Sequence, residues 1–185
     1  MTADAGKRGG LSSSPDDRAS RPILRPLPLP ATVTGRLWLA GLPHTDGHLE
    51  RFLFETAEHG VKHVLILTED HEIHDFAPAY AQLLSSRPLP FSVTRLPISD
   101  YGIPSDASAF RLAAQRTAGA LRLGESVLTH CRGGIGRTGL MSQAILIELG
   151  VSADQAGRQV ADAGSRCETA EQRAFLREAY AVAED

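Results

Sequence analysis

The segment from His130 to Gly139 carries most of the residues that could do chemistry. It reads His-Cys-Arg-Gly-Gly-Ile-Gly-Arg-Thr-Gly, with four glycines, two arginines and no acidic residue. Glycine-rich loops turn backbone N–H groups inward to form an anion-binding nest, and a helix beginning near Arg137 adds its free N–H groups and the positive end of its dipole. We expect this loop to bind a phosphate, with Arg137 contacting two oxygens through its planar guanidinium group.

Cys131 is the candidate nucleophile of this loop. Helix N-termini and nearby cations favour the thiolate form of a cysteine, so we expect Cys131 to be ionised at neutral pH. A thiolate beneath a bound phosphate is placed to attack phosphorus. Thr138 would donate a hydrogen bond to the sulfur and help it to leave, and His130 would fix the loop through its imidazole N–H. The phosphate would be held by Arg132, Gly133, Gly134, Ile135, Gly136 and Arg137.

Two other anion- or sulfur-binding loops fit these residues less well. The Walker A loop requires a glycine, four further residues and then Gly-Lys-Ser/Thr. Gly136-Arg137-Thr138 resembles its end, but Cys131 stands where the first glycine belongs and the lysine is missing. The cysteine loop of the rhodaneses is usually shorter and lacks the Arg-Thr-Gly ending. A buried structural cysteine in a glycine-rich turn would explain neither the arginine nor the glycines.

The order His130-Cys131, five residues, Arg137-Thr138-Gly139 resembles the signature of the cysteine-dependent protein tyrosine phosphatases. The resemblance covers roughly residues 36–180 and implies a two-step hydrolysis. The cysteine first takes the phosphoryl group, and water then attacks the cysteinyl-phosphate. The resemblance implies no metal and no organic cofactor.

Asp100 is the candidate for the acid that protonates the leaving oxygen. It lies in residues 96–104 (LPISDYGIP), directly after an expected strand over 91–96, and therefore at the same sheet edge as the cysteine loop. Glycine and prolines suit a loop that closes over a substrate. An aspartate followed four residues later by proline resembles the acid loop of these phosphatases. The tryptophan of the classical tyrosine-specific branch is absent, which favours the dual-specificity branch.

Other carboxylates near the expected site have simpler interpretations. Asp106 is the second candidate acid, but Asp106 or Ser105 is better placed as the N-cap of the helix that follows. The remaining carboxylates follow an expected strand over 62–67: Asp70 and Asp75, for which surface or capping roles are expected, and Glu69 and Glu72, which could brace the phosphate loop.

The segment from Cys167 to Gln172 (CETAEQ) resembles the loop that positions water for the second step in many tyrosine phosphatases. Gln172 matches the later glutamine of that pattern, whereas Glu168 replaces the earlier one, which is usually credited with positioning water. Thr169 and Gln172 also form a capping-box pattern for the last helix, and both interpretations can hold together. Cys167 is expected to be a bystander rather than a resolving thiol for Cys131.

The segment over 70–75 (DHEIHD) is the one stretch that suggests a metal site. Its histidines, His71 and His74, are three residues apart rather than the four of the zinc-protease helix. We therefore expect a solvated loop here and no metal. Trp38, the only tryptophan, is expected in the core or as a lid over it.

Hydrophobic periodicity indicates the elements that must position these residues. Apolar runs predict strands, and helical spacing between capping and stop residues predicts helices that alternate with them. This alternation predicts an α/β fold with a central, mostly parallel sheet, helices on both faces, and the phosphate loop between a strand and a helix at the carboxyl edge. The expected strands are 36–40, 62–67, 91–96 and 126–130, and the expected helices are 46–60, 75–86, 110–124, 137–149, 152–163 and 169–182.

Length and composition indicate one globular domain over residues 31–185. The chain has 185 residues, and its two cysteines exclude a disulfide-dense scaffold and a four-cysteine zinc site. Residues 1–20 are expected to be disordered, and the proline-rich residues 21–30 are expected to form an extended linker. The net charge of −3 argues against nucleic-acid binding, and no membrane-spanning or targeting segment is visible, so we expect a cytoplasmic monomer.

These observations favour an enzyme that dephosphorylates phosphotyrosine, and also phosphoserine or phosphothreonine, in proteins or peptides. The first alternative is a phosphatase acting on phosphoinositides or another non-protein ester. Many phosphoinositide phosphatases carry lysines inside the loop, where Gly134 and Gly136 stand here. The second alternative is a phosphate-binding module without turnover, which the joint presence of Cys131, Arg137 and Asp100 disfavours.

Overall fold

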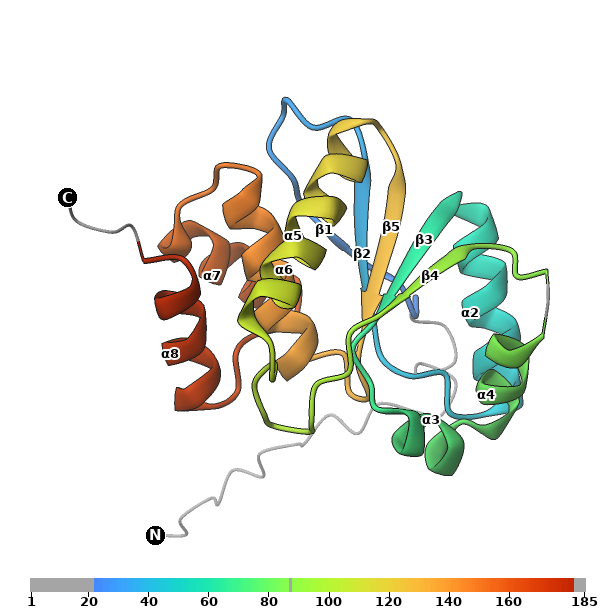
Figure 1. Ribbon diagram of the computed structural model, residues 1–185. Helices are drawn as coiled ribbons and strands as arrows, with labels where there is room; N and C mark the ends of the chain where they lie inside the picture. The colour runs from blue at the N-terminus through green and yellow to red at the C-terminus, as the bar shows by residue number, and fades with distance from the viewer. Residues whose placement is uncertain (1–21, 87, 182–185) are drawn as a thin grey trace, which may run out of the picture.

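The computed structural model describes residues 22–86 and 88–181 and places the strands in one twisted sheet (Figure 1). The strand order is β1-β2-β5-β3-β4, with β1 antiparallel to β2 and the other neighbours parallel. The strands are β1 (Arg25–Leu27), β2 (Arg36–Ala40), β3 (Val61–Ile66), β4 (Ser92–Arg95) and β5 (Ser126–His130). The prediction of a mostly parallel α/β sheet is confirmed.

Helices cover both faces of the sheet (Figure 1). Strand β5 lies in the middle, and its successive residues point to opposite faces: Val127 belongs to one apolar core and Leu128 to the other. One face carries α2 (Asp46–Glu58), α3 (Asp70–Phe76) and α4 (Pro78–Ser85), and the other carries α5 (Ala107–Arg122), α6 (Gly136–Glu148), α7 (Ala153–Asp162) and α8 (Ala170–Ala179). Within the described ranges, no helix combines the length and apolar character needed to cross a bilayer.

The proline-rich segment, whose composition predicts an extended linker, contributes β1. Leu24 and Leu27 are buried, and Pro26 lies opposite Trp38 of β2. Proline lacks an N–H, but β1 is an edge strand and needs no partner on its outer side. The expectation of an extended backbone therefore holds, whereas the expected domain start at residue 31 is too late, because residues 25–27 belong to the sheet. The expected disorder of residues 1–20 lies outside the described residues.

Helix α3 replaces the solvated loop that was expected over 70–75. The single helix expected over 75–86 is divided, because Pro78 begins α4 and proline is favoured at the first position of a helix. At the start of α3, the carboxylate of Glu72 accepts a hydrogen bond from the backbone N–H of Glu69 at 3.2 Å. The N-cap of α3 is Glu69, whereas sequence capping signals have Ser, Thr, Asp or Asn at that position, so the usual signal for this helix is missing.

Candidate active site

Cys131 lies directly after β5, at the middle of the carboxyl edge of the sheet, where ligands bind in open α/β folds. Its side chain is buried. A pocket of about 120 Å³ opens above it. The pocket is lined by Asp100, Tyr101, Cys131, Arg132, Gly133, Ile135, Gly136, Arg137 and Glu168. The structure therefore brings the predicted cysteine loop, acid loop and C-terminal loop together around one small space.

The loop after β5 has its carbonyl groups bonded on its outer side. Three of these hydrogen bonds join Leu67 N to His130 O (2.9 Å), Leu42 N to Arg132 O (2.9 Å) and Arg166 N to Ile135 O (3.2 Å). In a trans peptide the C=O and the following N–H point in opposite directions. Bonds outside the loop therefore turn the next N–H groups toward Cys131, which is the arrangement of an anion-binding nest.

One glycine of the loop is required by a close approach of the backbone. Gly134 has a φ of 68°, and a Cβ atom there would lie 2.5 Å from the carbonyl oxygen of Ala40 at the end of β2. A Cβ atom at Gly136 would instead meet the carboxylate of Glu168, the flexible end of a side chain that can move aside. The backbone contact and the positive φ therefore explain the glycine at position 134.

Arg137 is held from below by Glu72 of α3. The Arg137 Nη1 and Nη2 atoms donate to the two carboxylate oxygens of Glu72 at 2.6 and 2.9 Å, and Nη1 also donates to Ile98 O at 2.8 Å. Both side chains are buried. Burial works against the charge of each group, but the hydrogen bonds between them keep the pKa of Arg137 above and the pKa of Glu72 below its usual value. Of the two glutamates proposed as braces, Glu72 therefore contacts the arginine.

Asp100 reaches the same arginine from the acid loop. One carboxylate oxygen accepts a hydrogen bond from Arg137 Nη2 at 3.0 Å, and the other pairs with Arg132 Nη2. The second candidate acid, Asp106, is instead the N-cap of α5 and accepts bonds from Ser108 N and Ala109 N at 2.8 and 3.0 Å. The structure thus places Asp100 at the cysteine loop and leaves Asp106 with the capping role that the sequence indicated.

Two exposed aromatic side chains lie near the pocket: Tyr101 lines it, and Phe76 contacts Arg132. Tyr101 follows Asp100 with a φ of 58°, an uncommon conformation for a non-glycine residue, and its side chain is exposed. On the other side, the guanidinium group of Arg132 lies over the exposed ring of Phe76, 5.1 Å from its centroid. Sequence periodicity could not reveal this contact, because the expected helix over 75–86 places Phe76 at its start, whereas in the structure Phe76 ends α3.

His130 supports the loop as expected, although through two contacts rather than one. Its Nδ1 donates to Cys131 O at 3.4 Å, and its Nε2 accepts from the hydroxyl of Tyr80 on α4 at 3.0 Å. Complete burial lowers the pKa of His130 to about 4, so the imidazole is neutral at pH 7.

The expected hydrogen bond from Thr138 to the sulfur is not formed. Thr138 lies in the first turn of α6, and its buried hydroxyl has no hydrogen-bond partner among the described residues. The hydroxyl is therefore not engaged elsewhere in the described structure, but the contact to Cys131 itself is absent from this free state.

Gln172 and Glu168 have different positions in the C-terminal loop. The Gln172 side chain accepts a bond from Glu168 N at 2.9 Å and donates to Gly102 O of the acid loop at 2.9 Å. Gln172 thus ties the two loops together, while the carboxylate of Glu168 lines the pocket. Thr169 caps α8 by accepting from Gln172 N at 3.1 Å, as the capping-box pattern predicted.

Cys167 has a different environment from Cys131. Burial raises the pKa of Cys167 to about 11, and its sulfur accepts a bond from Gln143 Nε2 at 3.4 Å. Both cysteines are free thiols in this structure. A thiol with a raised pKa is a poor nucleophile at neutral pH, which agrees with the expected bystander role.

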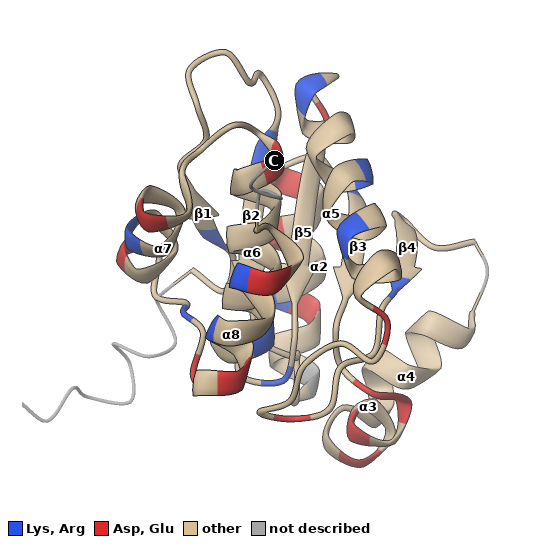
Figure 2. Cartoon of the chain, turned by 60° about the vertical axis from the view of Figure 1, so that its left-hand side comes forward, with Lys and Arg blue, Asp and Glu red and all other residues tan. Residues whose placement is uncertain are grey.

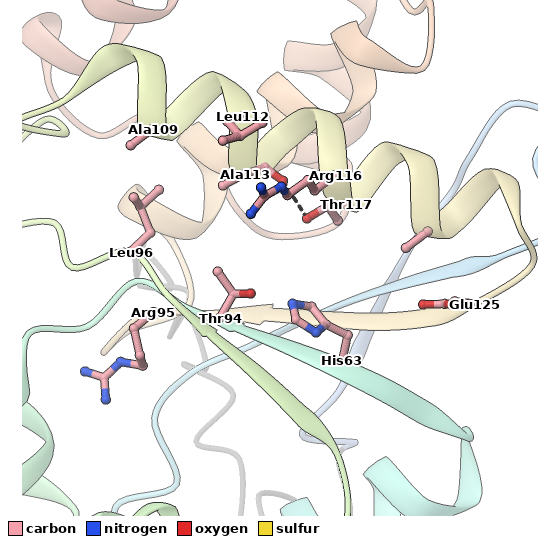
Figure 3. A pocket seen from close by; sticks show the side chains of 11 residues that line it. His63, Thr94, Arg95, Leu96, Ala109, Leu112, Ala113, Arg116, Thr117 and Glu125 are labelled. Atoms are coloured by element: carbon pink, nitrogen blue, oxygen red, sulfur yellow. Dashed lines mark hydrogen bonds between the residues drawn. The ribbon is translucent and has the colours of Figure 1, made fainter.

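Two further features lie away from the reaction site. Trp38 stacks on His59, with ring centroids 3.9 Å apart, and donates from Nε1 to Ser126. A cavity of about 330 Å³ lies between β4 and α5, where Thr117 donates to the backbone of α5 (Figure 3). Neither cysteine lines that cavity. In the described part of the chain, no group of three or more histidine, cysteine or acidic side chains could hold a metal ion.

Comparison with known families identifies the domain. Residues 33–183 match the model described as PTP-SAK, Swiss Army Knife protein, DSP-PTPase phosphatase domain. The chain therefore belongs to this family of dual-specificity-type protein tyrosine phosphatase domains, and the resemblance noted from the cysteine motif is confirmed. No curated protein matches the chain.

Solved structures of phosphatases share the fold. Kinase associated phosphatase, solved with its catalytic cysteine replaced by serine, is 20% identical, with a TM-score of 0.69 over 86% of this chain and 94% of that one. The active form of Tk-PTP is 27% identical, with a TM-score of 0.62 over 80% and 96%. PTPMT1 in complex with PI(5)P is 20% identical, with a TM-score of 0.58 over 77% and 88%.

Proposed function

We propose that this chain is a phosphomonoester hydrolase that acts on phosphotyrosine in proteins, and also on phosphoserine or phosphothreonine, through a cysteinyl-phosphate intermediate. The observation that carries this proposal is the meeting of Cys131, Arg137 and Asp100 at one pocket of about 120 Å³. Phosphoryl transfer from an ester requires a nucleophile, an oxyanion-binding cation and an acid around one small pocket.

In the first step, the Cys131 thiolate attacks phosphorus in line with the leaving oxygen. The inward N–H groups of the loop and the guanidinium group of Arg137 stabilise the equatorial oxygens of the transition state. The S–P bond forms as the P–O bond to the substrate breaks, and Asp100 donates its proton to the leaving alcohol or phenol. The Asp100 carboxylate is paired with Arg137 and Arg132. Arrival of the phosphate replaces the first of these contacts, and Asp100 takes up a proton from solvent before it acts as the acid.

In the second step, water attacks the cysteinyl-phosphate and Asp100 takes the water proton as a base. Gln172 already uses its amide to join two loops, whereas Glu168 faces the pocket. We therefore assign the positioning of this water to Glu168. As the S–P bond breaks, the otherwise unbonded hydroxyl of Thr138 is available to donate to the departing sulfur.

The surroundings of the pocket favour a peptide substrate with a single phosphate. Exposed Phe76 and Tyr101 offer apolar rings beside a side chain bearing the phosphate. Figure 2 shows acidic residues gathered on α3 and the loops beside it, and Arg132 is paired with Asp100. Glu72 and Asp100 are paired with arginines, and Asp70 is paired with Arg95. Glu168 lines the pocket without an ion pair among the described residues, and its charge would oppose the further phosphates of a polyphosphorylated headgroup.

A substrate panel tests this assignment. We expect kcat/KM for a phosphotyrosine peptide to exceed that for matched phosphoinositide vesicles by about tenfold or more, which corresponds to about 1.4 kcal/mol. Phosphate release is measured for phosphotyrosine, phosphoserine and phosphothreonine versions of one peptide and for the vesicles. A preference for the lipid would contradict the substrate class. Binding of phosphate without release from any substrate would show a module without turnover.

A further inference from the structure

Arg25 of β1 reaches the outer side of the Cys131 loop. Its Nη2 donates to Gly134 O and, at 3.2 Å, to Ser165 Oγ. Its Nη1 donates to Ala163 O at the end of α7 at 2.8 Å. Ser165 also donates its hydroxyl to Gly134 O at 2.7 Å. One carbonyl of the phosphate loop therefore receives two hydrogen bonds, one of them from a cation.

The carbonyl that Arg25 binds belongs to the peptide that turns the loop. Gly134 is the residue with a φ of 68° whose backbone lies against Ala40. Because C=O and N–H point in opposite directions across a peptide, holding Gly134 O outside the loop turns the N–H of Ile135 toward Cys131. Among the described residues, this N–H has no backbone hydrogen bond to a neighbouring element that would fix its direction by other means. The outer hydrogen bonds therefore set the direction of an oxyanion donor.

Arg25 also adds positive charge on the side of the loop opposite the pocket. Burial lowers the pKa of its guanidinium group, and a negative charge on the nearby sulfur of Cys131 acts in the opposite direction. The ionisable groups that face Cys131 come from β1, β5, the start of α6 and the loops around the pocket. They are Arg25, Asp100, Tyr101, His130, Arg132, Arg137 and Glu168. Arg132 and Arg137 are paired with carboxylates, which offset their charges. Arg25 differs from them because it donates to a carbonyl of the phosphate loop.

We propose that Arg25 is a positioning residue of the phosphatase site, holding the Gly134–Ile135 peptide in its anion-binding orientation and stabilising the Cys131 thiolate by its charge. The inference rests on the proposed function, because it assigns a role in that same reaction. The matched family segment begins at residue 33, so β1 and Arg25 lie outside it.

A neutral substitution at Arg25 tests both parts of the proposal. In Arg25→Gln we expect orthovanadate to bind about tenfold or more weakly, since a hydrogen bond from a charged donor is lost. We expect the midpoint of Cys131 alkylation by iodoacetamide to move up by about 0.5–1 pH unit, because a nearby cation is removed. Arg36→Gln is the matched control: Arg36 begins the neighbouring strand β2 with an exposed side chain, and it should leave both values unchanged.

Two further variants separate charge from geometry. Arg25→Lys keeps the charge but loses the two-pronged contact, so its alkylation midpoint should stay near that of the parent while vanadate binding weakens. Ser165→Ala removes the neutral donor to Gly134 O and should weaken vanadate binding about two- to fivefold without moving the midpoint. A mere anchor of β1 to α7 would lower thermal stability in Arg25→Gln without changing either readout, and that result would overturn the proposal.

The test remains decisive if Arg25→Gln does not fold. Arg25→Lys then decides, because parental vanadate affinity in that variant would contradict the positioning role. Vanadate binding and alkylation need no turnover, so the two proposals can fail separately. If the parent chain hydrolyses no phosphoester while Arg25→Gln still shifts both readouts, the proposed function is wrong and the positioning role stands. If the parent is active and neither readout shifts, only the role of Arg25 is wrong.

Discussion

At the scale of single residues, the site is built around one arginine that forms ion pairs with two carboxylates. Arg137 is bound from below by Glu72 and from the acid loop by Asp100. The contact with Glu72 is buried and bidentate, whereas Asp100 is about one-third exposed. The buried pair therefore fixes the guanidinium group, and the exposed contact is the one that a substrate can replace.

The role of Asp100 as acid gives the first prediction. In Asp100→Ala we expect kcat for a phosphopeptide to fall by about 10²–10⁴-fold, because the leaving oxygen is no longer protonated. The loss should be smaller for an aryl phosphate with a good leaving group. The control is Asp106→Ala, which removes only a helix cap. A comparable loss in that control, with Asp100→Ala nearly silent, would assign the acid to Asp106 instead.

The buried pair gives the second prediction. Glu72→Gln leaves the guanidinium group of Arg137 without its carboxylate, and we expect the free energy of unfolding to fall by about 3 kcal/mol. Urea unfolding at pH 7 measures the change. Glu69→Gln is the matched control, because Glu69 accepts a bond from the exposed side chain of Ser99 at 3.3 Å. Equal stability of the two variants would show that Glu72 is not the structural partner of the arginine.

At the scale of elements, strand β5 and helix α4 are joined under the site by His130 and Tyr80. The burial of His130 makes stability depend on pH, because it disfavours the charged imidazole. The folded-state pKa of His130 is about 4 and the unfolded value is about 6.5, so the unfolded chain binds more protons between these values. The stabilising effect is thus complete above pH 6.5 and is lost as the pH falls toward 4.

The third prediction follows from this loss of stability at low pH. Between pH 7.5 and 5, His130 should reduce the free energy of unfolding of the parent chain by about 2 kcal/mol. Unfolding by urea at the two pH values measures the loss. A His130→Asn variant, which has no group titrating there, should lose correspondingly less over the same interval. An identical pH dependence in parent and variant would contradict the buried neutral imidazole.

Some elements of the site could be predicted from the sequence, and others could not. The loop after β5 could be predicted because its chemistry lies in ten consecutive residues, and Asp100 because its loop follows a neighbouring strand at the same sheet edge. Helix α3 was missed because its polar residues resemble a solvated loop; only the burial of Glu72 against Arg137 reveals its purpose. That contact spans 65 residues, and local periodicity carries no record of such a pairing.

At the scale of the whole molecule, the domain begins earlier than its family motif. Strand β1 pairs with β2 at the sheet edge, and Arg25 contacts the phosphate loop 109 residues away in the chain. Strand β1 was not predicted because the prolines around it are typical of a linker. The acidic net charge of −3 is likewise uninformative about the site, because anion binding is produced locally by one loop and its arginines.

The packing of β1 gives the fourth prediction. Leu27→Ala should lower the free energy of unfolding by about 2–5 kcal/mol, because Leu27 is buried in the core beside α5 and α6. Leu123→Ala, at an 82% exposed side chain after α5, should change it by less than about 0.5 kcal/mol. Chemical denaturation of the full chain compares them. Equal, small effects would mean that β1 is not part of the cooperative domain.

The central claim is that Cys131 forms the covalent intermediate. The most direct measurement is phosphate release by Cys131→Ser from a phosphotyrosine peptide, with peptide binding followed by calorimetry and Cys167→Ser as the matched control. We expect the Cys131 variant to lose turnover while still binding the peptide, since the loop and Arg137 remain, and the Cys167 variant to keep parental activity. Normal hydrolysis by Cys131→Ser would contradict the mechanism.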